Sequence, residues 1–455
     1  MEQMNIPDTM YDTIVIGAGV SGLTAAYELT KSGNNVVVLE AANRTGGRIF
    51  TDHEGAFTYD VGTQLITEYF DETLQLIRDL GIKDHLERFK DVMWMRNNHK
   101  FKMHNIDSLW SRMNPPWLTV KDRLLLLRLL ADVIKYRKML SIQEIERSIA
   151  IDCCSVEEYA LRKLNSRILQ NFISPFLSTV FFAYPSETSF PLLAVLSKKL
   201  KDSKLYTLRS GIQLLTDELA SRVNVKFQKK AVNVVRVEHG WEVHTDDGRG
   251  IRKVWKSKQV VIATLAHQAL ELLANRSVIT DKQRQFLQKQ KYFSTFAFIT
   301  GYSRRIDAQA YCMIIPVSES PRISSICFEH EKCAQHAPEG FGLHNIHLHR
   351  GFAQEIMRYS EAEQKDAILT ELEKIFPTYR RYVVWSKLYN WIDAVPCTYP
   401  GKAKEILEFQ IEQWKNINSG LVFCGDYLNW PTVEGAIVVG KKAANMLLGR
   451  TKIMY

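Results

Sequence analysis

A strand, a glycine-rich turn and a helix open the chain, and they constrain its fold more than any other feature. Residues 13–16 are apolar and β-branched, and they lead directly into Gly17, Gly19 and Gly22. Apolar positions then recur at helical spacing as far as Gly33, and a second apolar strand over 36–39 ends at Glu40. This order predicts a βαβ unit that binds a dinucleotide.

Each residue of the turn has a physical role in such a unit. Gly17 permits the tight turn, Gly19 lets backbone approach a pyrophosphate, and Gly22 lets the helix pack closely on the strand. The first helical turn, which contains Val20 and Ser21, offers unpaired N–H groups and a partial positive charge to phosphates.

Glu40 stands eighteen residues beyond Gly22, where an acidic side chain accepts hydrogen bonds from an adenosine ribose. A 2′-phosphate at that position would meet a charge of its own sign. The residue therefore disfavours NADP as the ligand.

The stretch that follows Glu40 extends the motif and narrows the cofactor. It reads Ala41-Ala-Asn-Arg44-Thr-Gly46-Gly47-Arg48 and resembles the flavin-containing amine oxidase superfamily. That superfamily includes monoamine and polyamine oxidases, protoporphyrinogen oxidases and carotenoid-type desaturases. The resemblance implies that the stretch wraps FAD and that its contacts come from Ala41, Arg44, Gly47 and Arg48.

Three further segments carry the same resemblance. The run Gly425-Asp426 and the later Val433-Glu434-Gly435-Ala436 resemble the superfamily's C-terminal signature. They imply that Asp426 binds the ribityl or pyrophosphate region and that the helix start at Val433 faces the flavin. An Asp-x-Gly loop implies backbone contacts to the flavin ring, and a later strand contributes a backbone contact to adenine. The residues concerned are Gly62, Thr63, Gln64, Leu65 and Val232.

The 455 residues exceed one simple core and predict two or three domains. We expect an α/β fold in which an α+β substrate domain is inserted into a Rossmann-type FAD-binding domain. The FAD-binding domain is predicted to be discontinuous, over 1–65, 206–264 and 402–455. Residues 66–205 are expected to form a helical part of the substrate domain, and residues 265–401 a sheet-containing part.

Charge and cysteine content restrict the setting. The net charge is +9, but no nucleic-acid motif accompanies it, so no nucleic-acid partner is expected. No secretory signal or spanning segment is recognised, and seven cysteines without a CxxC pair indicate neither disulfides nor zinc. In the absence of these signals the chain is expected in the cytoplasm.

Histidines cluster at His344, His347 and His349. His347 and His349 are expected on one face of a strand, but the spacing places no third ligand beside them, so no metal is predicted.

The segment 110–140 leaves two alternatives open. It is basic, contains Trp110 and Trp117, and includes the run Arg123-Leu-Leu-Leu-Leu-Arg-Leu-Leu. Such a segment fits a helix lying on a membrane surface. It also fits a buried helix of the substrate domain, which we favour.

The catalytic residues of the better-known relatives are missing. Monoamine and polyamine oxidases carry a lysine on the strand that matches 294–299, where this chain has Thr295, Phe296 and Ala297. Where monoamine oxidases carry a tyrosine two residues before the glutamate, this chain has Thr432. We therefore assign no catalytic residue. Cys397 lies off the spacing used for covalent flavin, so FAD is expected to be bound non-covalently.

The substrate-domain stretches 155–189 and 390–401 resemble those of bacterial protoporphyrinogen-oxidase-like enzymes. The run Ala310–Pro316 lacks the glycine turn of true protoporphyrinogen oxidases, which disfavours a tetrapyrrole. We expect an oxidoreductase that removes a hydride from a C–N or activated ring C–H bond of a small cyclic or aromatic substrate. O₂ or another acceptor would take the electrons. Two alternatives remain open, a peripheral-membrane desaturase of a polyene or porphyrinogen and a non-catalytic flavin-binding protein; the oligomeric state is not predicted.

Overall fold

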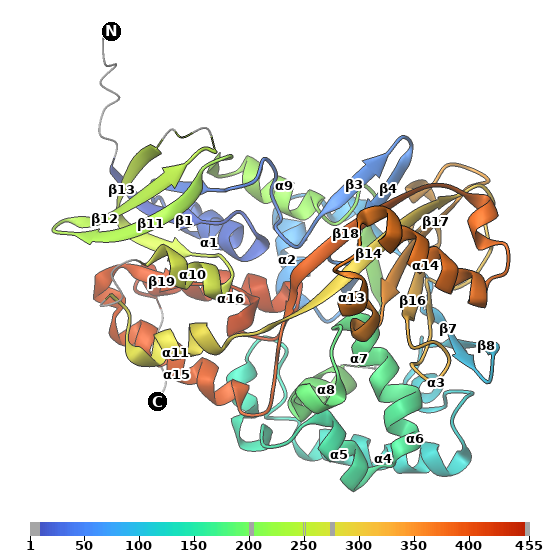
Figure 1. The fold of residues 1–455 in the computed structure, drawn as a ribbon. Helices are drawn as coiled ribbons and strands as arrows, with labels where there is room; N and C mark the ends of the chain where they lie inside the picture. The colour runs from blue at the N-terminus through green and yellow to red at the C-terminus, as the bar shows by residue number, and fades with distance from the viewer. Residues whose placement is uncertain (1–9, 200–203, 249, 251, 274–277, 451–455) are drawn as a thin grey trace.

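The computed structural model describes residues 10–199, 204–248, 250, 252–273 and 278–450, which fold around two large sheets (Figure 1). The first sheet has the strand order β10-β2-β1-β13-β12-β11, with β19 paired to β13. Its strands come from three distant parts of the sequence. They are β1 (Met10–Ile16), β2 (Val36–Leu39), β10 (Asn224–Lys226), β11 (Lys230–Val237), β12 (Gly240–Asp246), β13 (Arg252–Ile262) and β19 (Leu421–Phe423).

The predicted strand–turn–helix is present at the centre of this sheet. β1 pairs in parallel with β2 and with the end of β13, so that Ile16 lies beside Leu39 and Ile262. Helices α1 (Val20–Lys31) and α16 (Val433–Leu447) pack against each other beneath it (Figure 1). Since the carboxyl ends of β1, β2, β13 and β19 meet at one edge, that edge is where a ligand is expected.

The second sheet lies beside the first and has the order β18-β14-β17-β16-β15-β7-β8. It is antiparallel except where β15 runs parallel to β7. Helices α13 (Arg350–Ile356) and α14 (Glu361–Ile375) cover its outer face (Figure 1). Its strands are β7 (Val92–Asn97), β8 (Lys100–Asn105), β14 (Tyr292–Tyr302), β15 (Cys312–Ile314), β16 (Ile323–Phe328), β17 (Gly342–Leu348) and β18 (Val383–Pro396).

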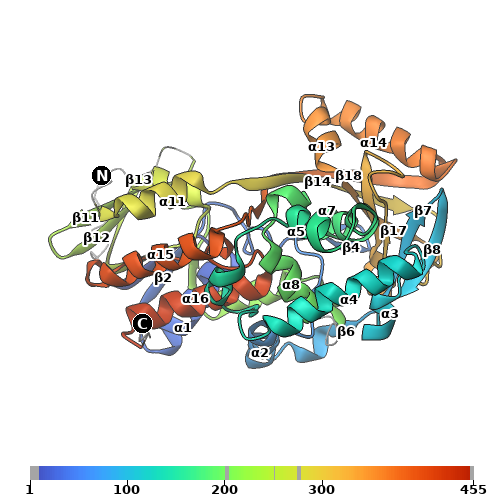
Figure 2. The ribbon, with the colours of Figure 1, turned by 90° about the horizontal axis from the view of Figure 1, so that it is seen from below.

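The segment 66–205, for which helices are predicted, contains four strands and α2 in its first part and helices in its second part. Between 66 and 105 the chain forms β5 (Ile66–Thr67), β6 (Leu86–Arg88), β7 and β8, interrupted by α2 (Asp71–Asp79). The helices then follow, and Figure 2 shows them grouped away from β11 and β12. They are α3 (Leu109–Met113), α4 (Val120–Lys135), α5 (Val156–Lys163), α6 (Ser166–Ile168), α7 (Ser174–Val180) and α8 (Phe190–Lys198). Ser155 caps α5 and forms a capping box with Glu158.

The remaining elements connect these layers. Two small sheets join β3 (Thr51–Glu54) to β4 (Phe57–Asp60) and β9 (Leu205–Leu208) to β5 and β6. No helix in the described part of the chain has both the length and the hydropathy needed to cross a membrane. The other helices are α9 (Leu214–Ser221), α10 (Ala266–Leu272), α11 (Asp281–Lys289), α12 (Glu329–Lys332) and α15 (Lys402–Lys415).

Candidate active site

A cavity of about 1140 Å³ runs from the edge of the first sheet into the space between the second sheet and the helices. All residues proposed from the sequence as cofactor contacts line it, except Gly22 and Arg44. Positions as distant as Gly19, Gln64, Val232 and Asp426 therefore face one space. The sequence did not single out the end of β13, where Ala263 and Thr264 also line the cavity.

The glycine turn fits a nucleotide. A Cβ at Gly19 would meet no protein atom within 4 Å, whereas one at Gly22 would lie 2.2 Å from the carbonyl oxygen of Gly17. Gly22 thus serves the packing of helix on strand, which explains why it does not line the cavity. Gly19 precedes α1, whose first turn has no side-chain cap and no acidic residue. These free N–H groups face a space in which a phosphate can accept their hydrogen bonds.

Glu40 lies at the end of β2 and holds the adjoining loops together. Its carboxylate accepts hydrogen bonds from the backbone N–H of Ala18 at 2.7 Å and of Ala42 at 2.8 Å. Each oxygen keeps lone pairs for a further donor. The residue can therefore bind a ribose hydroxyl while it orients the glycine turn.

Arg48 joins the two ends of the sequence at the cavity. Its guanidinium lies 2.7 Å from the carboxylate of Asp426, so two residues predicted separately form one ion pair. Arg44 is placed differently from what the resemblance implied. It donates to the carbonyl oxygens of Thr45 and Gly47 and stacks over Phe50 at 3.9 Å. Arg44 therefore supports the loop from behind and does not face the cavity.

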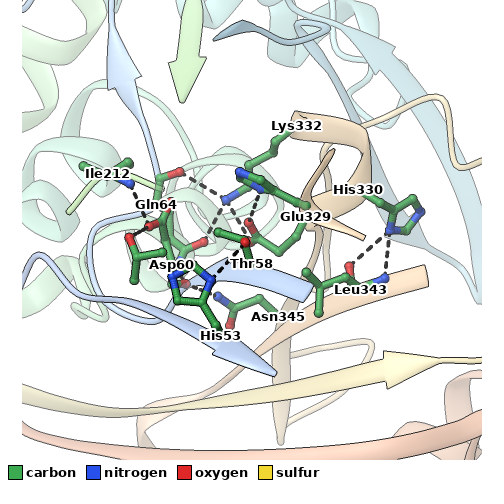
Figure 3. A network of polar contacts seen from close by, with 12 residues as sticks. His53, Thr58, Asp60, Gln64, Ile212, Glu329, His330, Lys332, Leu343 and Asn345 are labelled. Atoms are coloured by element: carbon green, nitrogen blue, oxygen red, sulfur yellow. Dashed lines mark hydrogen bonds and ion pairs between the residues drawn. The ribbon is translucent and has the colours of Figure 1, made fainter. Parts of the chain in front are cut away.

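The loop Gly62–Leu65 is held by a buried polar network (Figure 3). The ammonium group of Lys332 donates to the carbonyl oxygen of Gln64 at 3.1 Å and to its side-chain oxygen at 2.9 Å. It also pairs with Glu329 at 2.8 Å. The side-chain nitrogen of Gln64 donates to the carbonyl oxygen of Asp60 at 2.7 Å. Both ends of the Gln64 amide are therefore held by hydrogen bonds.

Asp60 is the titratable centre of this network. Its Oδ1 accepts hydrogen bonds from Thr51 and from the backbone N–H of Ile212, while Oδ2 has no partner among the described residues. Burial raises the pKa of the Asp60 carboxyl to about 7, although the positive charge of Lys332 acts in the opposite direction.

The second sheet forms one wall of the chamber beyond this loop. Thr295 and Ala297 on β14, His347 on β17 and Trp391 on β18 line the cavity. The indole N–H of Trp391 donates to the carbonyl oxygen of Val61 at 2.8 Å, which places this wall against the loop. Burial, followed by the charge of Lys332, lowers the pKa of His347 to about 4, so its imidazole is neutral at pH 7.

The rest of the chamber lining is mainly apolar and comes from the helices, from β7 and β15 of the second sheet, and from the adjoining loops. Phe181 and Phe182 line the cavity, and the ring of Phe182 meets that of His347 edge-on at 5.6 Å. Other lining residues are Met93, Met95, Ile106, Met113, Leu126, Leu129, Leu130, Phe172, Ile173, Phe176, Leu193, Leu196, Tyr311 and Ile314.

Two residues near the start of α16, Trp430 and Glu434, have structural roles. Trp430 is buried outside the cavity and donates its indole N–H to the carbonyl oxygen of Ser141 at 2.7 Å. Glu434 accepts the backbone N–H groups of Glu72 and Thr73. It thereby caps the start of α2, which has no side-chain cap from its own segment.

Lys332, His344 and His349 form contacts within the protein and do not line the cavity. Among the described cavity-lining residues the sole lysine is Lys230, and Lys332 lies behind the loop rather than in the chamber. His344 bonds Tyr379, and His349 bonds the carbonyl oxygen of Ile315. His349 lies beyond the end of β17 and so does not share the strand with His347. The described residues contain no cluster of three metal-ligating side chains.

The parallel strands around β1, the glycine turn, the carboxylate at the end of β2 and the contiguous chamber are typical of a dinucleotide-dependent oxidoreductase of the Rossmann class. The family model described as flavin containing amine oxidoreductase matches residues 20–448. The chain belongs to this family. It is an FAD-dependent oxidoreductase, and the empty space at Gly19 together with the carboxylate of Glu40 fits that cofactor.

The relatives agree on the fold and differ in activity. Protoporphyrinogen oxidase 2 of Arabidopsis thaliana is 22% identical over 95% of this chain and 93% of its own length. A putative protoporphyrinogen oxidase from Exiguobacterium sp. superposes with a TM-score of 0.76 at 17% identity, covering 98% of this chain and all of the other. Putrescine oxidase bound to putrescine gives 0.77 at 18% identity over the same shares. Likeness at this level shows the fold alone.

Proposed function

We propose that this protein removes a hydride from a C–N or activated ring C–H bond of a small cyclic or aromatic substrate. O₂ or another acceptor then takes the electrons. The observation that carries this proposal is the continuity of the cavity from the glycine turn, past the loop Gly62–Leu65, into an apolar chamber lined by aromatic and thioether side chains. FAD, when bound, supplies the two-electron acceptor. The protein supplies orientation and excludes water.

Few polar groups interrupt the chamber beside the loop. Thr295, His347 and Asn390 line it there, and His347 is held by a 3.2 Å contact between its Nδ1 and the hydroxyl of Ser325. A neutral imidazole can donate or accept one hydrogen bond and thereby orient a substrate nitrogen or ring. A neutral amine needs no dedicated base, so these groups are assigned to positioning.

Non-covalent binding of FAD is part of the proposal. Cys397 does not line the cavity. Burial, and to a smaller extent the negative charge of Glu187, raises the pKa of its thiol to about 11. A thiol with such a pKa is a poor nucleophile at pH 7.

Cytoplasmic location is proposed as well, and the seven free cysteines support it.

A second candidate is the peripheral-membrane desaturase. α4 buries Leu126, Leu129 and Val133 but exposes apolar side chains on its other face. We define the α3–α4 apolar patch as Trp110, Val120, Leu124, Leu127 and Ile134, each more than half exposed. Exposed Lys121, Arg128 and Lys135 lie on the same helix, which suits an anionic surface. α4 thus has one apolar face buried in the substrate domain and another that is exposed and could contact a membrane surface.

Co-sedimentation with vesicles tests this candidate. We expect vesicles that contain phosphatidylserine to retain the wild-type protein, and the variant Leu124→Gln/Leu127→Gln to stay in the supernatant. The matched control Leu161→Gln removes an exposed leucine on α5. Equal sedimentation of all three proteins would remove the membrane candidate.

Steady-state oxidation of a substrate panel tests the main proposal. The panel contains cyclic and aromatic amines, benzylamine, putrescine and protoporphyrinogen, with O₂ and an artificial dye as acceptors. We expect turnover of cyclic or ring-bearing compounds other than simple primary amines, because the lysine and the tyrosine of monoamine oxidases are absent and Thr432 stands in place of the tyrosine. Porphyrinogen oxidation should be weak or absent, since the large side chains of Tyr311 and Ile314 line the chamber. Efficient oxidation of protoporphyrinogen, or rapid turnover of benzylamine or putrescine, would refute the substrate class.

A further inference from the structure

Three nitrogen-bearing side chains meet where β8, α3 and the loop before α4 close the chamber. His104 belongs to β8, Arg112 to α3, and Trp117 to the loop. These elements lie across the molecule from α1 (Figure 1). The three side chains line the cavity, yet their exposed fractions are 6%, 5% and 7%. We call them the Arg112 pocket.

Each member of the Arg112 pocket has a nitrogen without a partner among the described residues. These atoms are Nη1 of Arg112, Nε2 of His104 and Nε1 of Trp117. The Nε of Arg112 donates to the carbonyl oxygen of Ile106, which anchors the guanidinium and leaves Nη1 free. Because an unsatisfied buried donor is costly, and a buried charge more so, this arrangement is typical of a site that awaits an acceptor.

The charge of the Arg112 pocket is positive. Burial lowers the pKa of Arg112, but a guanidinium remains protonated at pH 7. Asp91 attracts it, yet Asp91 forms its ion pair with Arg88 at 3.3 Å, and no described carboxylate pairs with Arg112. Burial, followed by the charges of Arg112 and Arg123, lowers the pKa of His104 to about 4, so this ring is neutral. The guanidinium of Arg112 therefore lines the cavity without an ion pair among the described residues, although the charge of Asp91, whose Oδ1 also lacks a hydrogen-bond partner, acts on it.

The surroundings of the Arg112 pocket are apolar. Met113, Leu126 and Leu129 line the same part of the chamber, and the ring of His104 meets that of Trp117 edge-on at 5.2 Å. An inorganic anion would leave these walls uncovered. A molecule with an apolar body and one acidic group would satisfy both the walls and the donors.

We propose that the Arg112 pocket binds the carboxylate of the substrate, and that the substrate is therefore an apolar carboxylic acid whose ring or chain fills the chamber. The inference rests on the proposed function, because it assigns this cavity to substrate. Arg112 and Trp117 donate to the carboxylate oxygens, and His104 donates in the tautomer that carries its proton on Nε2. This group fixes the end of the molecule remote from the reacting bond, so it selects substrate and takes no part in the chemistry.

Calorimetric titration of the FAD-loaded protein with a matched pair of probes tests the proposal. The probes are 4-phenylbutyrate and its uncharged amide, 4-phenylbutyramide. We expect the acid to bind the wild-type protein about tenfold more tightly than the amide, as for hydrogen bonds to a charged group. Arg112→Met should abolish this preference and leave the flavin absorption unchanged.

Two further variants keep the test informative if Arg112→Met folds poorly. Trp117→Phe removes one N–H and keeps an aromatic ring. The affinity for the acid should therefore fall by about threefold, while the affinity for the amide should change less. Arg123→Met removes a neighbouring cation that does not line the cavity and should keep the preference.

Equal affinities of the two probes for the wild-type protein, no binding of either, or a preference that survives Arg112→Met would overturn the inference. Because binding is measured without turnover, its outcome is separate from that of the proposed reaction. A protein that prefers the acid but oxidises no member of the panel would retain the pocket and lose the proposed function.

Discussion

Gly19 and Gly22 lie on one turn and face different surroundings, which makes them a matched pair at the residue scale. Gly19→Val should leave the fold intact, because the φ of −71° at this position suits any residue and a Cβ there would meet no protein atom within 4 Å. The side chain would occupy the space of the pyrophosphate, so FAD content should fall to about a tenth or less, more so with Glu40→Arg. Gly22→Val should instead destabilise the fold, since the space beside Gly17 is filled. Flavin absorbance and circular dichroism together measure both effects. A Gly19→Val protein with full flavin content would contradict the nucleotide site. Cys397 supports a second residue-scale prediction, because it lies off the cavity. Acid precipitation should release the flavin into the supernatant, equally from the wild type and from Cys397→Ala. Yellow colour that stays with the wild-type pellet and not with the variant would show covalent attachment.

At the scale of elements, the loop Gly62–Leu65 depends on a helix distant in the sequence. Lys332 on α12 is buried and fixes Gln64, so Lys332→Met should leave Glu329 without its cation. We expect FAD to dissociate about tenfold more readily from this variant, because an unpaired buried charge disturbs the loop. Lys332→Met/Glu329→Gln removes both charges and should recover much of the affinity; fluorescence titration of the apoprotein with FAD measures it. An unchanged affinity in Lys332→Met would show that the loop is ordered without the network. The same elements show what the sequence could predict. The strand over 36–39 and the turn before α1 are local, and the periodicity and glycine spacing identified them. The contact between Lys332 and Gln64 spans 268 residues, so no local pattern could reveal it. The hairpin of β7 and β8 was missed although it carried a signal. Asn98 and His99 both have positive φ and form its two-residue turn, for which asparagine is well suited.

For the whole molecule, the buried Asp60 couples stability to pH. Its pKa of about 7 in the folded chain exceeds the ordinary value of 3.8, so the folded state binds more protons than the unfolded state between these values. The free energy of unfolding should therefore fall as pH rises through this window. Asp60→Asn retains an oxygen for Thr51 and Ile212 and cannot ionise. We expect its loss of stability between about pH 5 and about pH 8 to be smaller than that of the wild type by on the order of 1 kcal/mol; urea unfolding at both pH values measures it. Equal losses would show that Asp60 keeps its ordinary pKa. The chamber belongs to this scale as well, because its walls come from β14, β17, β18 and the helices α4, α7 and α8, and their meeting follows from tertiary packing. The sequence predicted residues that line one end of the cavity, whereas the placement of Phe181, Phe182 and the Arg112 pocket became recognisable once the chain was folded.

Anaerobic mixing of the FAD-loaded protein with ring-bearing amines and apolar ring-bearing carboxylic acids tests whether the protein oxidises a ring-bearing substrate with its flavin. At least one of these compounds should bleach the visible flavin band at a rate that saturates with its concentration. Gly19→Val, which lacks the cofactor, should give no signal. A protein whose flavin is reduced by dithionite but by no compound of the panel would contradict the claim and favour a flavin-binding protein without turnover.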